Sequence, residues 1–301
     1  MTKNKLIVVL GPTACGKTKI ATKLAKLVDG EIVSADSRQV YKGMDIGTGK
    51  DLVDYNINKK TIPYHLIDII KPMTSFDVAK YQRLAYKAIN NIVGRGKTPI
   101  LVGGTGLYLD AVVKGYSFSK ASPQAKEIRK RLTKLSLKQL LSRLKKIDPK
   151  TYRTIQKQNK RRVQRALEIY YESGIPKSKQ APNKKPPYDV LTIGIKFPLE
   201  KIYHKIDSRL EARIQEGMIK EVKKLRKSGV TWKKLDNFGL EYRWVSRYLR
   251  GIVDYQELVA NLKNDIHHFA KRQLTWFKRN KDIKWVTNYN QAEKLAKKFL
   301  K

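Results

Sequence analysis

The stretch that decides the fold is Leu6–Thr18, which reads LIVVLGPTACGKT. Leu6–Leu10 is a continuous apolar run, which is typical of a buried parallel strand. Gly11–Thr18 matches the phosphate-binding loop motif, GxxxxGK followed by Ser or Thr, at all four specified positions. A helical stretch from Thr18 to about Leu27 follows it. The segment therefore predicts an α/β fold in which backbone N–H groups at a helix N-terminus bind phosphate.

The loop also predicts roles for its own side chains. Lys17 would reach the outer phosphate, and the hydroxyl of Thr18 would bind Mg²⁺. Cys15 is interpreted as a small residue that fills the loop. The predicted phosphate-binding residues are Gly11, Pro12, Thr13, Ala14, Cys15, Gly16, Lys17 and Thr18. Taken alone, such a loop favours a nucleotide-binding protein, such as an ATP-binding kinase or an NTPase.

Two further apolar runs predict more strands of the same sheet. They are Glu31–Ala35 and Pro99–Val102, with a helix predicted from about Val78 to Val93 between them. Strand and helix in alternation imply a parallel sheet whose ligand site lies at the carboxyl ends of the strands. Asp36 ends the second strand there, where it could reach Mg²⁺ through water, act as a general base, or cap a turn.

The character of the chain changes after Gly115. Residues 124–173 show helical apolar spacing within dense positive charge, and a Pro-rich loop follows at 178–187. A strand at 189–197, a long helix at about 200–227, a helix at about 255–278 and a short strand at 284–286 complete the pattern. We therefore expect a P-loop core with C-terminal helices, made of residues 1–115 and 189–301, and a helical insertion at 116–188.

The composition is strongly basic, with 65 Lys+Arg against 26 Asp+Glu and a formal net charge of +39. A general lysine bias is one explanation, and a polyanionic partner is the other. The distribution favours nucleic acid, because 15 of the 18 arginines lie beyond residue 113. Apolar runs are far shorter than the roughly 18 residues of a membrane span, and one cysteine excludes a disulfide framework. We expect a cytoplasmic protein with no membrane partner.

Beyond these patterns, the chain resembles the bacterial tRNA dimethylallyltransferases (tRNA isopentenyltransferases). The stretches that carry the resemblance, in chain order, are GPTACGKT (Gly11–Thr18), SADSRQVYKGMDIGTGK (Ser34–Lys50), LVGGTGLYLDA (Leu101–Ala111), RRVQRALE (Arg161–Glu168), GLEYR (Gly239–Arg243) and KRQLTWFKR (Lys271–Arg279). They span nearly the whole chain, and the D-S-x-x-x-Y block at Asp36–Tyr41 is more specific than the loop.

The resemblance implies transfer of a dimethylallyl group from dimethylallyl diphosphate to N6 of the adenosine 3′ of the anticodon. The loop would then hold a prenyl diphosphate with Mg²⁺ in place of ATP. Asp36, Lys17 and Thr18 would be the catalytic residues, with Asp36 accepting a proton from N6 as the C–N bond forms. Arg209 matches a family arginine that reaches the diphosphate. A monomer would suffice to enclose one tRNA anticodon arm.

The resemblance and the basic patches together predict a tRNA-binding set. Its members are Asp36, Ser37, Arg38, Gln39, Thr105, Lys126, Arg161, Arg162, Val163, Gln164, Arg165, Gly239, Tyr242, Arg243, Lys271, Arg272, Gln273 and Trp276. Two positions depart from the family pattern. Lys126 stands where an arginine is common, and Glu241 replaces a small residue.

Three other functions stay open at this point. A small-molecule P-loop kinase would explain the loop but not the basic second half. A non-catalytic RNA-binding protein would explain the charge but not Lys17, Thr18 and Asp36 together. A free-adenine-nucleotide prenyltransferase shares the chemistry, yet it would need no basic patches at 160–165 and 271–279.

Overall fold

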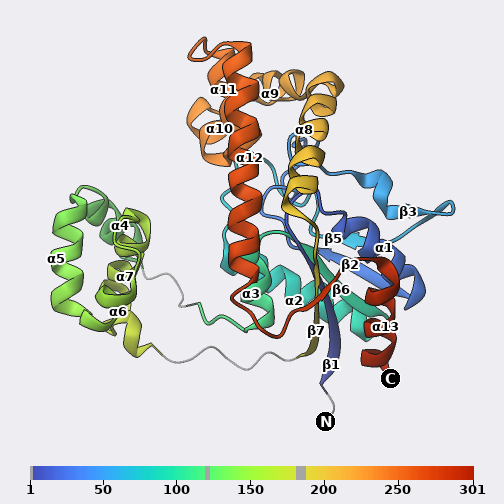
Figure 1. The fold of residues 1–301 in the computed structure, drawn as a ribbon. Coiled ribbons are helices and arrows are strands. Elements are labelled where there is room, and N and C mark those ends of the chain that lie inside the picture. The colour runs from blue at the N-terminus through green and yellow to red at the C-terminus, as the bar shows by residue number, and fades with distance from the viewer. Residues whose placement is uncertain (1–2, 119–122, 181–187) are drawn as a thin grey trace. The chain divides into compact units, whose positions relative to one another are not determined.

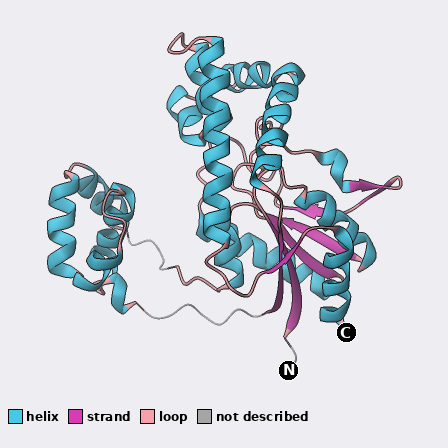
Figure 2. Cartoon of the chain, viewed as in Figure 1, coloured by secondary structure: helices cyan, strands magenta, loops and turns pink. Residues whose placement is uncertain are grey.

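The computed structural model describes residues 3–118, 123–180 and 188–301. The chain divides into two compact units, one made of Met1–Gly115 with Lys185–Lys301 and the other of Tyr116–Lys184 (Figure 1). The first is an α/β unit, and the described part of the second consists of helices joined by loops (Figure 2). The predicted fold class, a P-loop parallel sheet with an inserted helical region, is confirmed.

A six-stranded sheet forms the centre of the first unit, and all of its strand pairs are parallel. In sheet order the strands are β5 (Tyr64–His65), β2 (Gly30–Ser34), β6 (Thr98–Gly103), β1 (Asn4–Leu10), β7 (Tyr188–Ile195) and β8 (Lys284–Val286). The register pairs Leu10 with Gly103 and with Gly194. The loops that leave β1 and β6 therefore start side by side at one edge of the sheet.

Both faces of the sheet are covered, which is why β1 reads as a continuous apolar run. Leu6, Val8 and Leu10 pack into one core with α2 (Val78–Gly94) and α3 (Gly106–Val113). Ile7 and Val9 pack into the other core with α1 (Lys17–Leu27) and α13 (Tyr289–Leu300). Successive side chains of a strand point to opposite faces, so alternate residues of β1 supply the two cores. The sequence pattern did not predict α13.

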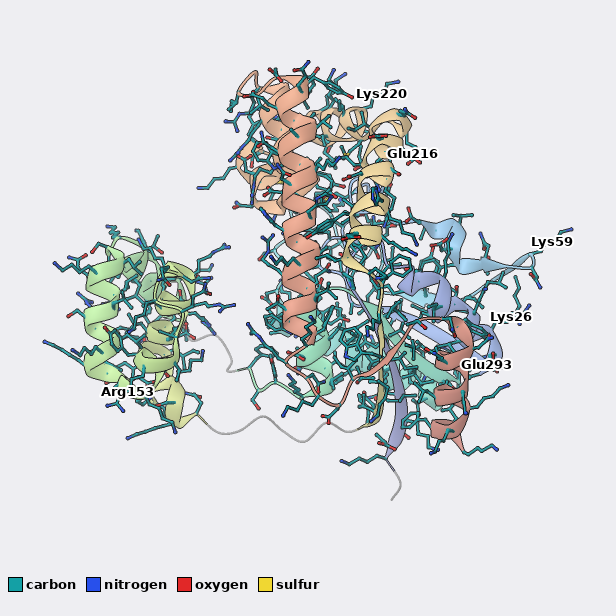
Figure 3. The ribbon with its side chains drawn as sticks, viewed as in Figure 1. Lys26, Lys59, Arg153, Glu216, Lys220 and Glu293 are labelled. Atoms are coloured by element: carbon teal, nitrogen blue, oxygen red, sulfur yellow. The ribbon has the colours of Figure 1, made fainter. Side chains whose placement is uncertain are left out.

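The remaining helices of this unit surround a third core. They are α8 (Leu199–Glu216), α9 (Met218–Lys227), α10 (Trp232–Phe238), α11 (Leu240–Leu249) and α12 (Tyr255–Phe277). The prediction of one helix over 200–227 is wrong, because Gly217 adopts a left-handed conformation (φ +106°) that ends α8 and begins α9. Glu216 and Lys220 lie on either side of this break (Figure 3).

A short segment between β2 and β5 completes the unit. It holds a 3₁₀ turn, η1 (Leu52–Tyr55), and a two-stranded hairpin of β3 (Asn56–Ile57) and β4 (Lys60–Thr61). In the part of the chain that the structure describes, no helix combines the length and apolar character that crossing a bilayer requires.

The second unit consists of α4 (Ala125–Thr133), α5 (Leu137–Ile147), α6 (Pro149–Thr154), α7 (Lys160–Ser173) and a 3₁₀ turn, η2 (Lys177–Lys179). Apolar residues of α4, α5 and α7 form a core of their own around Leu140, Leu144 and Leu167. The predicted helical character of 124–173 is confirmed. The predicted Pro-rich loop falls largely on residues 181–187, which lie outside the described part.

Candidate phosphate-binding and catalytic site

The loop Gly11–Lys17 turns sharply between β1 and α1. Ala14 (φ 60°) and Gly16 (φ 80°) both adopt left-handed backbone conformations, and Gly16 begins α1 without a side-chain cap. The first N–H groups of α1 are therefore available to an anion. Lys17 donates from Nζ to the Pro12 carbonyl oxygen at 3.2 Å, which holds its ammonium group over the loop. Cys15 is buried, as its interpretation as a loop filler predicts.

Gln273 of α12 ties this loop to the neighbouring strand. The Thr13 N–H donates to Gln273 Oε1 at 2.8 Å, and Gln273 Nε2 donates to the Gly104 carbonyl oxygen at 2.8 Å. The side chain is buried. Each end of its amide has one partner within the protein, so Gln273 braces the loop, and its predicted contact with tRNA stays a prediction.

Asp36 follows β2 at the same edge of the sheet. Its Oδ1 accepts from the N–H groups of Arg38 (2.8 Å) and Gln39 (3.3 Å), so Asp36 caps a turn. The Ser37 N–H donates to Thr105 Oγ1 at 3.1 Å, which joins the loops after β2 and β6. Capping and catalysis were separate interpretations of the sequence. The structure allows both, because the capping bonds of Asp36 use a single carboxylate oxygen.

The side chains of Gln39 and Arg38, which follow Ser37 in this turn, make different contacts. Gln39 Nε2 donates to the Gly49 carbonyl oxygen at 3.0 Å and thus braces the loop that follows β2. Arg38 lies over the ring of Phe238, with its guanidinium carbon 5.7 Å from the ring centroid, and donates to the Asn237 carbonyl oxygen. The Arg38 guanidinium therefore lies against the C-terminal end of α10.

The phosphate loop and Asp36 line one cavity of about 690 Å³. Thr13, Lys17 and Thr18 come from the loop, Asp36 from the end of β2, and Arg209 from α8. The structure thus brings together the predicted catalytic residues and the predicted diphosphate arginine. Asp51 and Asp54 also line this cavity. Burial raises the pKa of Asp54, and the nearby Lys19 partly offsets the effect.

A second arginine, Arg213, accompanies Arg209 on α8 and lines the same cavity. Arg209 pairs with Asp51 at 3.0 Å, and Arg213 Nη1 lies 3.9 Å from Glu241 Oε1. Burial raises the pKa of Glu241, although Arg213 opposes this shift. The sequence analysis did not select Arg213. Its position four residues after Arg209, hence on the same helical face, was the available signal.

The site fits a magnesium ion that is held mainly by a bound phosphate. Among the described residues, no group of three or more His, Cys, Asp and Glu could hold a metal. Mg²⁺ commonly takes one or two protein oxygens and completes its shell with phosphate oxygens and water. Thr18 and the carboxylates of Asp36 and Asp51 line the cavity and supply oxygens of the right kind.

The predicted tRNA-binding residues on α11 and α12 differ in how far their side chains are exposed to solvent. Lys271 and Arg272 are exposed on α12. Trp276 is half-buried and donates from Nε1 to Asp110 Oδ2 at 3.0 Å. Tyr242 is fully buried against Gly47, and its hydroxyl donates to Glu221 Oε1, so its side chain is part of the core and offers no surface to RNA. This corrects the prediction for Tyr242.

Gly239 and Arg243 lie at the junction of α10 and α11. Gly239 has φ +78° between the two helices, and Arg243 donates from Nε to the Asp236 carbonyl oxygen at 3.3 Å. The glycine is required by this positive φ. Its role in the structure is therefore to set the angle between the two helices.

The predicted residues of the second unit are Lys126, on α4, and the run 161–165, on α7. Lys126, Arg161, Arg162 and Arg165 are exposed. Arg165 pairs with Glu168 at 3.0 Å and with Glu172 at 3.5 Å. Gln164 donates to Thr133 and Glu168. The prediction for Val163 is wrong with respect to its side chain, which is buried in the core of this unit.

Comparisons with known proteins match this arrangement. The IPP transferase family model matches residues 39–280. The chain is 44% identical over 290 residues to tRNA dimethylallyltransferase 1 of Syntrophus aciditrophicus, covering 95% of this chain and 94% of that one. It is 44% identical over 282 residues to the tRNA dimethylallyltransferase of Roseiflexus castenholzii, covering 92% and 91%.

Two solved structures are similar over almost the whole chain. The tRNA isopentenylpyrophosphate transferase of Bacillus halodurans is 35% identical with a TM-score of 0.71, over 99% of this chain and 98% of that one. A eukaryotic dimethylallyltransferase acting on tRNA is 25% identical with a TM-score of 0.79, over 98% of this chain and 77% of that one. From the fold, the site and these matches together, the chain belongs to the IPP transferase family, whose members include the tRNA dimethylallyltransferases.

Proposed function

We propose that this enzyme transfers a dimethylallyl group from dimethylallyl diphosphate to N6 of the adenosine 3′ of the anticodon in tRNA. The observation that carries the proposal is that the phosphate loop and the carboxylate of Asp36 line one cavity. The site therefore offers an anion cradle for the leaving group and a base for the nucleophile. The relatives support this function and not a kinase or a free-nucleotide prenyltransferase.

The phosphate side of the cavity would stabilise the leaving group. When the allylic C–O bond breaks, its electron pair stays on the diphosphate oxygen and negative charge grows there. The uncapped N–H groups of α1 and the ammonium of Lys17 would stabilise this negative charge on the diphosphate. Thr18 would hold Mg²⁺, which supplies further positive charge to the diphosphate when bound.

Asp36 would take the proton from the nucleophile. The lone pair of an exocyclic adenine nitrogen is delocalised into the ring, so N6 gains nucleophilicity as its N–H bond is weakened by a base. The turn of Arg38 and Gln39 fixes Asp36 through Oδ1. In the balanced step, the N6–C bond forms, the C–O bond breaks, the proton moves to Asp36 and diphosphate leaves.

The tRNA would present the adenosine outside its base stack, because N6 must reach Asp36 inside the cavity. Exposed cations on α12 and α7 are suited to the RNA backbone, since phosphate contacts supply position and affinity. We propose that the enzyme works in the cytoplasm as a monomer on one anticodon arm.

The test supplies labelled dimethylallyl diphosphate and Mg²⁺ with either unmodified tRNA or AMP, and follows the label into each acceptor. Label in tRNA alone is the expected result. Label in AMP would make this a free-nucleotide enzyme. No label in either acceptor, together with ATP hydrolysis or phosphate transfer, would contradict the proposal. Omitting Mg²⁺ should abolish transfer if Thr18 holds the ion.

A further inference from the structure

Three loops leave the sheet at one edge and divide the reacting groups between them. The phosphate loop follows β1, Asp36 follows β2, and Thr105 follows β6. β1 and β2 are not neighbours, because β6 lies between them in the sheet. Two strand spacings, about 10 Å, therefore separate the strand that leads to the phosphate loop from the strand that leads to Asp36. Contacts beyond the strands have to fix how these loops lie relative to one another.

Gln273 of α12 makes the contact between the phosphate loop and the loop after β6. Its Oε1 accepts from the Thr13 N–H and its Nε2 donates to the Gly104 carbonyl oxygen, both at 2.8 Å. A backbone N–H only donates and a carbonyl oxygen only accepts, so the two partners determine which end of the amide is oxygen. Joining these two groups takes a side chain that accepts at one end and donates at the other.

The loop after β6 continues the connection to the turn of Asp36. Thr105 donates from its N–H to the Ala35 carbonyl oxygen at 3.2 Å. Its Oγ1 accepts from the Ser37 N–H at 3.1 Å. Hydrogen bonds therefore lead from the phosphate loop through Gln273 and the loop after β6 to the residues on either side of Asp36.

The surroundings hold Gln273 in place. Its side chain is buried, and a Cβ atom built on Gly104 would lie 2.4 Å from Gln273 Nε2, so the contact requires a glycine there. On the same helix, Ala270 and Phe277 are buried in two different cores. One turn further on, Trp276 bonds to α3, against which this end of α12 lies (Figure 1). A side chain that projects from a helix anchored in this way can hold two loops at a fixed separation.

We propose that Gln273 is a positioning residue that fixes the phosphate loop relative to Asp36, and with it the leaving group relative to the base. This inference rests on the proposed function and adds a residue that acts through the two loops it joins. The nucleophile has to approach the carbon atom that diphosphate leaves, and a displacement of about 1 Å can lower the rate about 10²-fold.

The test compares Gln273→Met with the wild type in the full chain. Methionine has a similar length but cannot make the two amide bonds. At saturating tRNA and dimethylallyl diphosphate, the single-turnover rate constant should fall roughly 10- to 100-fold. The dissociation constant of inorganic diphosphate with Mg²⁺ should rise roughly 3- to 10-fold, because the loop then has to be ordered on binding. The matched control is Gln256→Met, at an exposed position of the same helix, which should change both constants by no more than about twofold.

Gln273→Glu adds a dependence on pH. An ionised carboxylate can accept from the Thr13 N–H but cannot donate to the Gly104 carbonyl oxygen, whereas a protonated carboxyl can do both. Burial raises the pKa of a carboxyl group. The rate of Gln273→Glu, divided by the wild-type rate at the same pH, should therefore rise as the pH falls from about 8 to about 6. The same ratio for Gln273→Met should stay constant.

The outcomes separate positioning from stability alone. A near-wild-type rate of Gln273→Met at saturation, combined with a lower melting temperature, would overturn the inference. If Gln273→Met does not fold, a rate ratio of Gln273→Glu that does not change with pH would overturn it. Wild-type protein that binds diphosphate but transfers no dimethylallyl group would contradict the proposed function. In that case an unchanged diphosphate constant in Gln273→Met would overturn the inference as well, and a raised one would support it.

Discussion

Asp36 caps a turn and is proposed to act as the catalytic base, and two substitutions separate these two roles. Asp36→Asn keeps Oδ1 as an acceptor for Arg38 and Gln39 but cannot accept a proton. We expect the rate of transfer to fall by roughly 10²- to 10⁴-fold, with little change in the free energy of unfolding. Asp36→Ala should lose the same activity and an additional 1 kcal/mol or so of stability. Single-turnover transfer and urea unfolding measure the two effects.

Binding of tRNA is the control for both Asp36 variants. It should stay near the wild-type value, because the exposed cations on α12 and α7 are unaltered. Near-normal turnover of Asp36→Asn would remove Asp36 as the base. The hydrogen bonds to the turn would then be its whole function.

Glu31 gives the first unit a stability that depends on pH. This buried carboxylate of β2 accepts from Arg95 at 2.6 and 2.8 Å and contacts His65 at 2.8 Å. The Arg95 guanidinium lowers the pKa of Glu31 from 4.5 to about 2, against the opposing effect of burial. A lowered pKa in the folded state means that the contribution is present above pH 4.5 and is lost as the pH falls toward 2.

We therefore expect acid to remove about 2–3 kcal/mol of the free energy of unfolding between pH 5 and 2 through this group. Urea unfolding at a series of pH values measures it. Glu31→Gln should be less stable at pH 7 by a similar amount and should show a flatter acid limb. A Glu31→Gln curve parallel to that of the wild type would show that Arg95 does not act on this carboxylate.

Among the elements, α9 holds the loop that leads to the cavity. Glu221 accepts from the N–H groups of Asp45 (2.7 Å), Ile46 (2.7 Å) and Gly47 (3.2 Å), and from the Tyr242 hydroxyl of α11 (2.8 Å). Gly49, two residues further on, is where the two guanidinium groups of α8 converge. One carboxylate thus connects α9, α11 and the wall of the phosphate site.

Glu221→Gln should lower the free energy of unfolding by about 2–3 kcal/mol, because its amide NH₂ would face groups that are themselves donors. The KM for dimethylallyl diphosphate should rise in the same variant as the loop loosens. Tyr242→Phe is the matched control, since it removes one bond to Glu221 and should cost about 1 kcal/mol. Equal stability of the two variants would mean that the backbone bonds to Glu221 contribute nothing.

At the scale of the whole molecule, the net charge of +39 has two explanations, which are binding of RNA and a general lysine bias. The double variant Lys271→Ala, Arg272→Ala removes two exposed charges from α12. If both contact phosphates, tRNA affinity should fall roughly 10-fold and the slope of log affinity against log salt should decrease by about 1 to 2. Filter binding between low and moderate salt measures both quantities.

The control for that experiment is Lys294→Ala, Lys298→Ala on α13, which removes the same charge from another exposed helix of the same unit. Its affinity and salt slope should stay close to wild type. An equal effect of both double variants would indicate that tRNA senses only the overall charge, in line with a general lysine bias.

Local patterns determined much of the fold. The apolar runs and the glycine loop predicted β1, β2, β6 and the P-loop within a residue or two, because strands buried on both faces are continuous apolar segments. The break of the long helix at Gly217 and the existence of α13 were not predicted. A glycine can occupy a helix or end it, and only the packing of α8 and α9 around the third core selects φ +106°.

The sequence by itself placed the candidate site, since Lys17, Thr18 and Asp36 lie in motifs that follow two strands of one parallel sheet, β1 and β2, at their carboxyl ends. Tertiary structure alone decided which polar residues serve the ligand and which serve the fold. Gln273 and Tyr242 bond inside the protein, whereas Lys17, Thr18 and Asp36 line the cavity. The reason is physical: a hydrogen-bonding group is committed or available according to its neighbours in space, and those neighbours lie far away along the chain.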